Sequence, residues 1–142
     1  MKISKRGRYG IRLLIDLAEN RHCDHVTLIS AAERQAISAR YLEQVAIILR
    51  RAGYIRSIKG ASGGYALAKP VEDIKVGDAL RALEGDMLIA EPPPPGCGKF
   101  QRCVWRVVFE PLNRRIAEII DSETLASLVG TVDNKENYMY FI

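Results

Sequence analysis

Residues 28–67 read LISAAERQAISARYLEQVAIILRRAGYIRSIKGASGGYAL. Apolar residues lie on one side of a short first segment, and Leu42, Val45 and Leu49 recur at the spacing of a helix buried along one stripe. Ser38 stands between the two segments, where its hydroxyl can accept a hydrogen bond from an amide of the next turn and so start the second helix. The stretch therefore predicts two helices joined by a tight turn.

A glycine-tipped hairpin is predicted after the second helix. Aromatic and β-branched residues lie on both sides of the sequence GASGG, as is typical of paired strands: Tyr54, Ile55, Ile58, Tyr65 and Leu67. A loop for a nucleotide phosphate is a weaker interpretation, because the segment lacks a Lys-Ser/Thr ending and precedes a strand instead of a helix. The order indicates a winged helix-turn-helix, with the helix-turn-helix at residues 28–52 and the wing at residues 54–68.

The second helix carries hydrogen-bond donors on the face opposite its apolar stripe. In a recognition helix the N-terminal part meets base edges in the major groove, and a basic hairpin tip can touch the minor groove or the backbone. Candidate DNA-binding residues in the helix and the hairpin tip are Arg40, Tyr41, Gln44, Lys59 and Ser62. The alternative is a three-helix bundle with a polar face that is only solvated.

The charge of the chain is unevenly distributed. Residues 1–70 contain 13 Lys and Arg against 5 Asp and Glu, a net of +8, whereas residues 71–142 contain 8 against 12, a net of −4. Phosphates are the obvious counter-charge for the first half, so Lys2, Lys5 and Arg6 join the candidate DNA-binding residues. A membrane surface fits less well, because these cations lead into a helix of mixed charge whose apolar stripe suits a protein core.

Length and composition limit the class of protein. A chain of 142 residues, 48% of them hydrophobic, suffices for one domain with an appendage or for a small domain that dimerises. We expect a cytoplasmic protein, since there is no apolar run of about eighteen residues and no signal sequence. Residues 22–25 read HCDH, but neighbouring residues in a loop seldom converge on one ion, so a solvated loop without a metal is expected. No catalytic set can be assembled, and we expect no enzyme.

The second half, residues 71–142, is expected to serve dimerisation and regulation. After a helix from Val76 to Glu84 and a stiff spacer at Pro92–Pro95, an apolar seam recurs in steps of four and three: Trp105, Phe109, Leu112, Ile116 and Ile119. Such a seam predicts a long helix at about residues 101–121, roughly 30 Å in length, that pairs with a second copy of the chain. Packing of the seam on the chain's own body is the alternative. Pro111 predicts a kink or a restart, because it lacks an N–H and crowds the carbonyl of Val107.

Several segments resemble the IscR/CymR family of winged helix-turn-helix regulators. The resemblance covers nearly the whole chain and rests on MKISKRGRYG, ISARYLEQ, IRSIKGASGGYAL, VGDALRALEG and SETLASLV. It implies a homodimeric DNA-binding regulator, in most cases a repressor, controlled by an iron–sulfur cluster, nitric oxide or cysteine supply. It also implies that Ser38, Tyr41 and Gln44 lie at the recognition helix and Lys59 at the wing.

The cluster-binding members of this family have three cysteines and often a histidine between the fourth helix and the long helix. In this chain Cys97 and Cys103 remain, while Glu91 and Arg106 stand where the first cysteine and the histidine are expected. A guanidinium has no lone pair for iron, and two thiolates are too few for the usual four-ligand shell. We therefore expect no iron–sulfur cofactor. Two ordinary reduced thiols, a redox-switching pair and remnant ligands are the interpretations left for the cysteines.

The ending NYMYFI resembles the aromatic tail found in the cysteine-metabolism branch of the family. In that branch the repressor pairs with cysteine synthase, whose ligand O-acetylserine reports sulfur status, and serine acetyltransferases bind the same synthase through a C-terminal isoleucine. The resemblance implies that Tyr140, Phe141 and Ile142 bind the synthase and that the protein represses genes of cysteine and sulfur metabolism. The alternatives for the tail are a final β-strand or packing on the partner subunit. The alternatives for the function are an iron–sulfur or thiol-redox sensor and a protein-interaction module without sequence-specific DNA binding.

Overall fold

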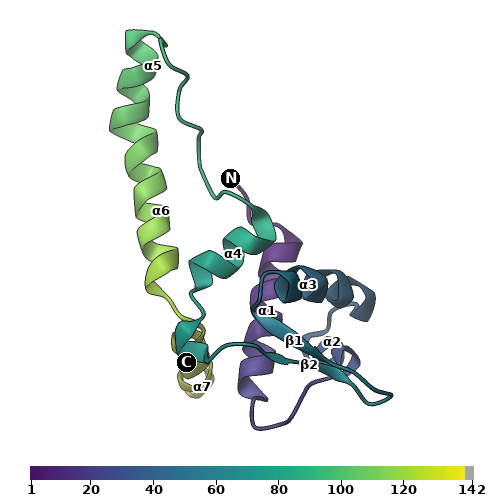
Figure 1. The fold of residues 1–142 in the computed structure, drawn as a ribbon. Coiled ribbons are helices and arrows are strands. Elements are labelled where there is room, and N and C mark those ends of the chain that lie inside the picture. The colour runs from purple at the N-terminus through teal and green to yellow at the C-terminus, as the bar shows by residue number, and fades with distance from the viewer. Residues whose placement is uncertain (140–142) are drawn as a thin grey trace.

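The computed structural model gives the backbone of residues 1–139 and the side chains of residues 1–132. The predicted class, a mainly α winged helix-turn-helix, is confirmed. Along the chain the elements are α1 (Lys5–Glu19), α2 (Leu28–Gln35), α3 (Ala39–Arg51), β1 (Ile55–Ile58), β2 (Gly64–Leu67), a 3₁₀ turn (Val71–Asp73), α4 (Val76–Glu84), α5 (Lys99–Val104), a π-helical turn (Trp105–Phe109), α6 (Glu110–Ser122) and α7 (Leu125–Met139). Figure 1 shows α1 between the winged helix-turn-helix and α4, and an arm made of α5 and α6 that extends away from them.

Both helices of the helix-turn-helix begin at a capping hydroxyl. Thr27 Oγ1 accepts a hydrogen bond from the amide of Ser30 at 3.2 Å, and Ser38 Oγ accepts one from the amide of Tyr41 at 3.4 Å. Ala36 ends α2 with a φ of 53°, a left-handed conformation that turns the chain sharply toward α3. The two helices lie where the sequence predicts them, and Ser38 has the capping role expected of it.

The wing is supported along one edge by the loop between α1 and α2. β1 and β2 pair antiparallel, with Ile55 opposite Leu67. On the other side of β2, Val26 and Tyr65 exchange two backbone hydrogen bonds of 2.8 Å. Gly64 permits this close approach, because a Cβ at that position would lie 2.2 Å from the carbonyl oxygen of Val26. The hairpin predicted for residues 54–68 is confirmed.

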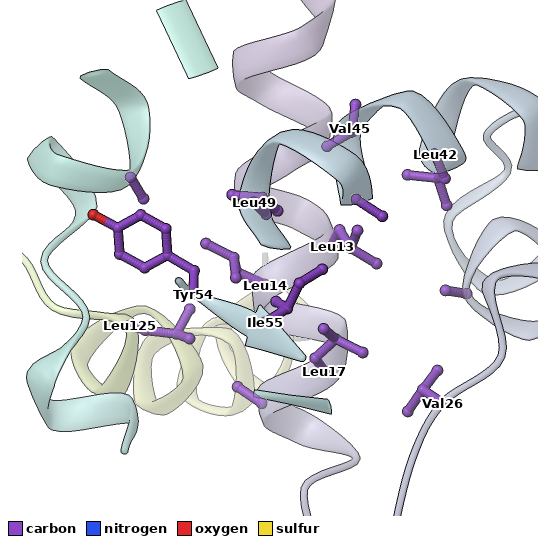
Figure 2. Close-up of a cluster of buried hydrophobic side chains, with 14 of the residues drawn as sticks. Leu13, Leu14, Leu17, Val26, Leu42, Val45, Leu49, Tyr54, Ile55 and Leu125 are labelled. Atoms are coloured by element: carbon purple, nitrogen blue, oxygen red, sulfur yellow. The ribbon is translucent and has the colours of Figure 1, made fainter. Parts of the chain in front are cut away.

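One hydrophobic core joins the winged helix-turn-helix to the second half of the chain. Figure 2 shows leucines of α1 and α3 meeting around Ile55 of β1, with Leu125 of α7 in the same cluster. Leu83 of α4 is also buried in this core. Residues on both sides of position 70 therefore pack in one hydrophobic core. The division of the chain at position 70 is a proposed division of functional roles.

The long helix predicted at about residues 101–121 is present, and it is interrupted close to Pro111. Helical backbone runs from Lys99 to Ser122, with the π-helical turn directly before α6. In this turn the amide of Glu110 donates to the carbonyl of Trp105, five residues earlier, instead of four. Because proline has no N–H to donate, the α-helical ladder is interrupted here, and the π turn is the form of the interruption that the sequence predicts at Pro111.

The C-terminal segment contains a helix that the sequence does not predict. α7 follows a short backbone bridge in which the amide of Val76 donates to Glu123 and the amide of Leu125 donates to Ile74, at 2.9 and 2.8 Å. This bridge places Leu125 in the core, where it is 1% exposed. Tyr140, Phe141 and Ile142 lie outside the described residues. No helix in the described part of the chain is long and apolar enough to cross a membrane.

Candidate nucleic-acid interface

The buried carboxylate of Asp16 in α1 binds two side chains of α2 and so holds the two helices together. Asp16 is 2% exposed and accepts hydrogen bonds from Arg34 Nη2 at 2.6 Å, from Arg34 Nε at 3.0 Å and from Gln35 Nε2 at 3.2 Å. The hydrogen bond to this carboxylate raises the pKa of Arg34. A buried carboxylate held by a bidentate arginine is geometrically demanding, so the first helix of the helix-turn-helix has a defined position on α1.

The recognition helix α3 buries its apolar stripe and leaves its polar face exposed. Leu42, Val45 and Leu49 are 0–1% exposed, so the opposite face, which carries Arg40 and Gln44, points outward. Exposed donors in the first turns of such a helix are free to meet base edges in a major groove. Arg40 and Gln44 are exposed on this face, and their contacts with bases stay a prediction.

Tyr41 differs from the other predicted residues because it is half-buried. Its ring packs edge-on against the ring of Tyr9 in α1, with a centroid distance of 5.5 Å and an interplanar angle of 85°. The guanidinium of Arg12 lies 5.3 Å from the centroid of the Tyr9 ring and also donates from Nη2 to the backbone carbonyl of Gln35 at 2.5 Å. These contacts orient Tyr41 and place the start of α1 beside the start of α3.

The tip of the wing presents Lys59 and Ser62 at the surface. Gly63 makes the tight turn possible, because a Cβ there would lie 2.1 Å from the carbonyl oxygen of Ile58. The imidazole Nε2 of His25 donates a hydrogen bond to the carbonyl oxygen of Ser62, which ties the tip to the loop after α1. Lys59 is therefore carried on a hairpin that is supported at its tip as well as along its edge.

A hollow of about 450 Å³ connects the start of α2 with the wing. Its lining includes Thr27, Ser57 and Lys59, whose hydroxyl and ammonium groups suit a sugar–phosphate backbone. Thr27 and Ser57 are candidate contacts that the sequence does not reveal as such, because their signal there is only that of a helix cap and of a strand residue. Tertiary structure brings them to the side of Lys59.

The N-terminal cations lie at the start of α1. Lys2, Lys5 and Arg6 are exposed, and none of the ion pairs in the described part of the chain involves them. The contact between Tyr9 and Tyr41 brings this end of α1 next to the recognition helix. The predicted DNA-binding residues thus lie on three segments, which are the start of α1, the recognition helix α3 and the tip of the wing.

The apolar seam lies on the arm and is largely uncovered. Leu112 is 45% and Ile119 62% exposed, whereas Trp105, Phe109 and Ile116 are half-buried. α6 packs on the body through α4, so packing on the chain's own body accounts for one end of the seam. A hollow of about 380 Å³ at the other end is lined by Trp105, Phe109, Phe100, Val104, Gln101, Ala90, Glu91 and Pro93.

The cysteines are free thiols, and the described residues do not form a cluster site. Cys97 is half-buried and Cys103 exposed, and among residues 1–132 no group of three His, Cys, Asp or Glu side chains is close enough to hold a metal ion. Arg106 is exposed and offers no lone pair. The donor set in this segment therefore does not fit an iron–sulfur cluster, and Cys23 lies apart from it in the exposed loop after α1.

Known proteins resemble this chain along most of its length. The sequence profile of the Rrf2 family, described as an iron-dependent transcriptional regulator, matches residues 3–131. Protein Rrf2 of Nitratidesulfovibrio vulgaris is 39% identical over 91% of this chain and 87% of its own length. CymR of Bacillus subtilis is 36% identical over 100% of both chains.

Solved structures agree with these sequence matches. The structure of B. subtilis CymR, described as the global cysteine regulator of that organism, superposes with a TM-score of 0.78 at 34% identity and covers 92% of this chain and 98% of its own. IscR of T. potens superposes with a TM-score of 0.73 at 39% identity, over 99% and 96% of the two chains. The resemblance to the IscR/CymR family is confirmed, and the chain belongs to the Rrf2 family of transcriptional regulators.

Proposed function

We propose that the chain is a homodimeric repressor that binds an inverted-repeat operator in double-stranded DNA. The observation that carries the proposal is a helix-turn-helix with exposed donors joined to an apolar arm that the described residues leave largely uncovered. Phe100, at 77% exposed, extends the same apolar surface at the Trp105 end of the arm, and a second copy covering this surface would stabilise it. A two-fold dimer carries two recognition helices, each reading one half-site about 34 Å from the other, or a multiple of that distance.

Within the family we propose control of genes for cysteine and sulfur metabolism. The support is the alignment with B. subtilis CymR over the full length of both chains, together with the ending NYMYFI. Tyr140, Phe141 and Ile142 supply aromatic and aliphatic anchors of the kind that fill a partner's pocket. The proposed partner of this tail is cysteine synthase, with O-acetylserine competing for the same pocket.

A sensor of iron–sulfur clusters or of thiol redox state is the second candidate. It is favoured by the family's description as iron-dependent and by the 39% identity with T. potens IscR. The donors near Cys97 and Cys103 speak against a cluster, because Arg106 cannot ligate iron. Reversible oxidation of the two thiols needs no further ligand and is the form of this alternative that the residues allow.

DNase footprinting on fragments that precede sulfur-metabolism genes tests the DNA-binding proposal. Two protected half-sites on one face of the duplex are expected from a dimer, whereas one short half-site protected by a monomer would contradict it. Absence of any protection beyond that of random DNA would favour an interaction module without sequence-specific binding. Visible absorption of the anaerobically purified protein, together with its iron and sulfide content, distinguishes a cluster sensor from a regulator without a cluster. Stoichiometric iron and sulfide would establish the cluster alternative.

Titration calorimetry tests the proposed tail partner. The parent protein should bind cysteine synthase, and O-acetylserine should dissociate the complex. Deletion of Tyr140 to Ile142 should abolish this binding and leave the dimer intact. Unchanged affinity of the truncated protein would contradict the tail's role, and a truncated protein that becomes monomeric would establish that the tail packs on the partner subunit.

A further inference from the structure

The carboxylate of Glu84, the last residue of α4, lies at the start of α1. Its Oε1 accepts hydrogen bonds from the amide of Ser4 at 3.1 Å, from the Ser4 hydroxyl at 2.5 Å and from the amide of Gly7 at 2.9 Å. Ser4 is also the N-cap of α1, since its Oγ accepts from the amide of Gly7 at 3.3 Å. A helix leaves its first amides without partners and carries partial positive charge there, so one carboxylate from a distant helix completes the cap.

The packing around this contact leaves room for the carboxylate and for little else. A Cβ at Gly7 would lie 2.3 Å from Glu84 Oε1 and 3.0 Å from Ile3 Cγ2. Gly7 itself is buried, and Glu84 is half-buried. The first turn of α1 is therefore seated on the end of α4, and the carboxylate of Glu84 is the polar group that holds it.

The turn that Glu84 holds carries the N-terminal cations. Lys5 and Arg6 are in this turn and Lys2 precedes it, and all three side chains are exposed. One turn further along α1, the ring of Tyr9 packs against the ring of Tyr41 in the recognition helix, with a centroid distance of 5.5 Å. The distance between these cations and the recognition helix thus depends on whether the first turn of α1 is formed.

The same helix α4 also contacts the arm. Arg81 makes two hydrogen bonds to Asp121 of α6, Nη1 to Oδ1 at 2.7 Å and Nη2 to Oδ2 at 3.0 Å. Figure 1 shows α4 between the arm and the start of α1. The helix α4 therefore makes two connections. Arg81 contacts the helix that carries the seam, and Glu84 contacts the turn that carries the N-terminal cations.

We propose that Glu84 is a positioning residue for DNA binding: by capping α1 it holds Lys2, Lys5 and Arg6 beside the recognition helix, where they contact the phosphate backbone. The proposal rests on the DNA-binding function proposed above. It assigns to an acidic residue a favourable effect on the binding of a polyanion, opposite in sign to the effect of its charge alone. That opposition makes the proposal testable.

The test compares Glu84→Ala with Asp86→Ala, which removes the same charge from an exposed residue two positions away. Fluorescence anisotropy with a random-sequence duplex at several salt concentrations gives the affinity. It also gives the salt slope, which is the slope of the logarithm of the affinity against the logarithm of the salt concentration. Glu84→Ala should lower the affinity and flatten the slope by about 1 to 3 per subunit, since each lost phosphate contact removes about 0.9. Asp86→Ala should leave the slope unchanged and bind as tightly as the parent or slightly more tightly.

Hydrogen exchange separates this role from a general loss of structure. Faster exchange should appear at the Gly7 amide in Glu84→Ala, with the amides of α3 unchanged. Ser4→Ala removes one of the three donors to Glu84, together with the hydroxyl that accepts from the Gly7 amide, without a change in charge. It should shift the slope and the affinity in the same direction by less. This variant decides the matter if Glu84→Ala does not fold: an unchanged slope in Ser4→Ala would then overturn the proposal.

A Glu84→Ala protein that folds and matches Asp86→Ala in slope and affinity would overturn this proposal alone. A parent protein that binds no duplex would contradict the proposed function and this proposal together. The two failures are therefore distinguishable in the same set of titrations.

Discussion

Arg81 in α4 and Asp121 in α6 form a bidentate ion pair, with N–O distances of 2.7 and 3.0 Å. Asp121 is in the helix that carries the seam, so this pair attaches the arm to the body. The hydrogen bond from Arg81 lowers the pKa of Asp121, and the same bond raises the pKa of Arg81. Both side chains are more than one third exposed, which limits the contribution of the pair to stability to about 1 kcal/mol or less.

The lowered pKa of Asp121 predicts a pH dependence of stability. A carboxylate whose pKa is lower in the folded than in the unfolded protein stabilises the fold above its unfolded value, and this stabilisation is lost as the pH falls through the folded value. Asp121→Asn should therefore destabilise the protein slightly at neutral pH and cause no difference in strong acid. Urea unfolding of parent and variant at both pH values measures this. A difference that persists in strong acid would indicate a steric cause.

Gly10→Ala should destabilise the protein because α1 and α4 are in close contact at this position. An added Cβ would lie 2.3 and 2.8 Å from the two methyl carbons of Leu83, which is buried in the core, so a shift of this side chain would disturb the packing around it. Overpacking of this kind costs about 1–3 kcal/mol. Gly130→Ala in α7 is the control, since its Cβ would have no neighbour within 4 Å among the described residues and alanine favours a helix. Thermal unfolding should give a lower Tm for the first variant and an unchanged or higher Tm for the second.

Ile119→Glu should disrupt the proposed dimer. The substitution places a charge in the apolar seam, and burial of an unpaired carboxylate against a second copy is strongly unfavourable. Ile29→Glu is the matched control, because Ile29 is similarly exposed, at 67% against 62%, but lies in α2 far along the chain from the seam. Sedimentation equilibrium should show monomers for Ile119→Glu and dimers for Ile29→Glu. Dimers in both cases would place the interface elsewhere.

Gln44→Ala and Lys5→Ala should weaken DNA binding in different ways. Gln44 is exposed on the recognition helix, so its loss should reduce discrimination between operator and random DNA by about 1–3 kcal/mol. Lys5 is expected to contact a phosphate, so its loss should weaken binding to both duplexes and flatten the salt slope by about 0.9. Competition titrations at two salt concentrations separate these effects, and equal effects of both variants on random DNA would contradict the assignment.

The double variant Cys97→Ser with Cys103→Ser should retain operator affinity under reducing conditions. Among the described residues, the ligands near Cys97 and Cys103 are too few for an iron–sulfur cluster. We therefore expect that DNA binding does not require iron held by these two thiols. Gel shift of parent and variant, each purified without oxygen, measures the affinity. A loss of about tenfold or more in the variant, with its thermal stability unchanged, would establish that the thiols act in DNA binding.

Local signals in the sequence are sufficient for the elements of the winged helix-turn-helix. Ser38 predicts the start of α3 because a hydroxyl caps the amides of the next turn. The spacing of Leu42, Val45 and Leu49 predicts the buried face, because a helix has 3.6 residues per turn. Pro111 predicts the interruption of the long helix, because it has no N–H to donate.

The relations between these elements are decided by tertiary structure. The contact of Glu84 with Ser4 and Gly7 joins residues about eighty positions apart, and that of Arg81 with Asp121 joins residues forty positions apart. No spacing or composition rule connects such residues, because the contacts depend on how whole helices pack. The sequence by itself determined the helices and strands of the winged helix-turn-helix, the long helix with its interruption, and the faces that carry donors. Only the packed structure decided which carboxylate caps α1, where α7 lies, and which residues stand beside the recognition helix.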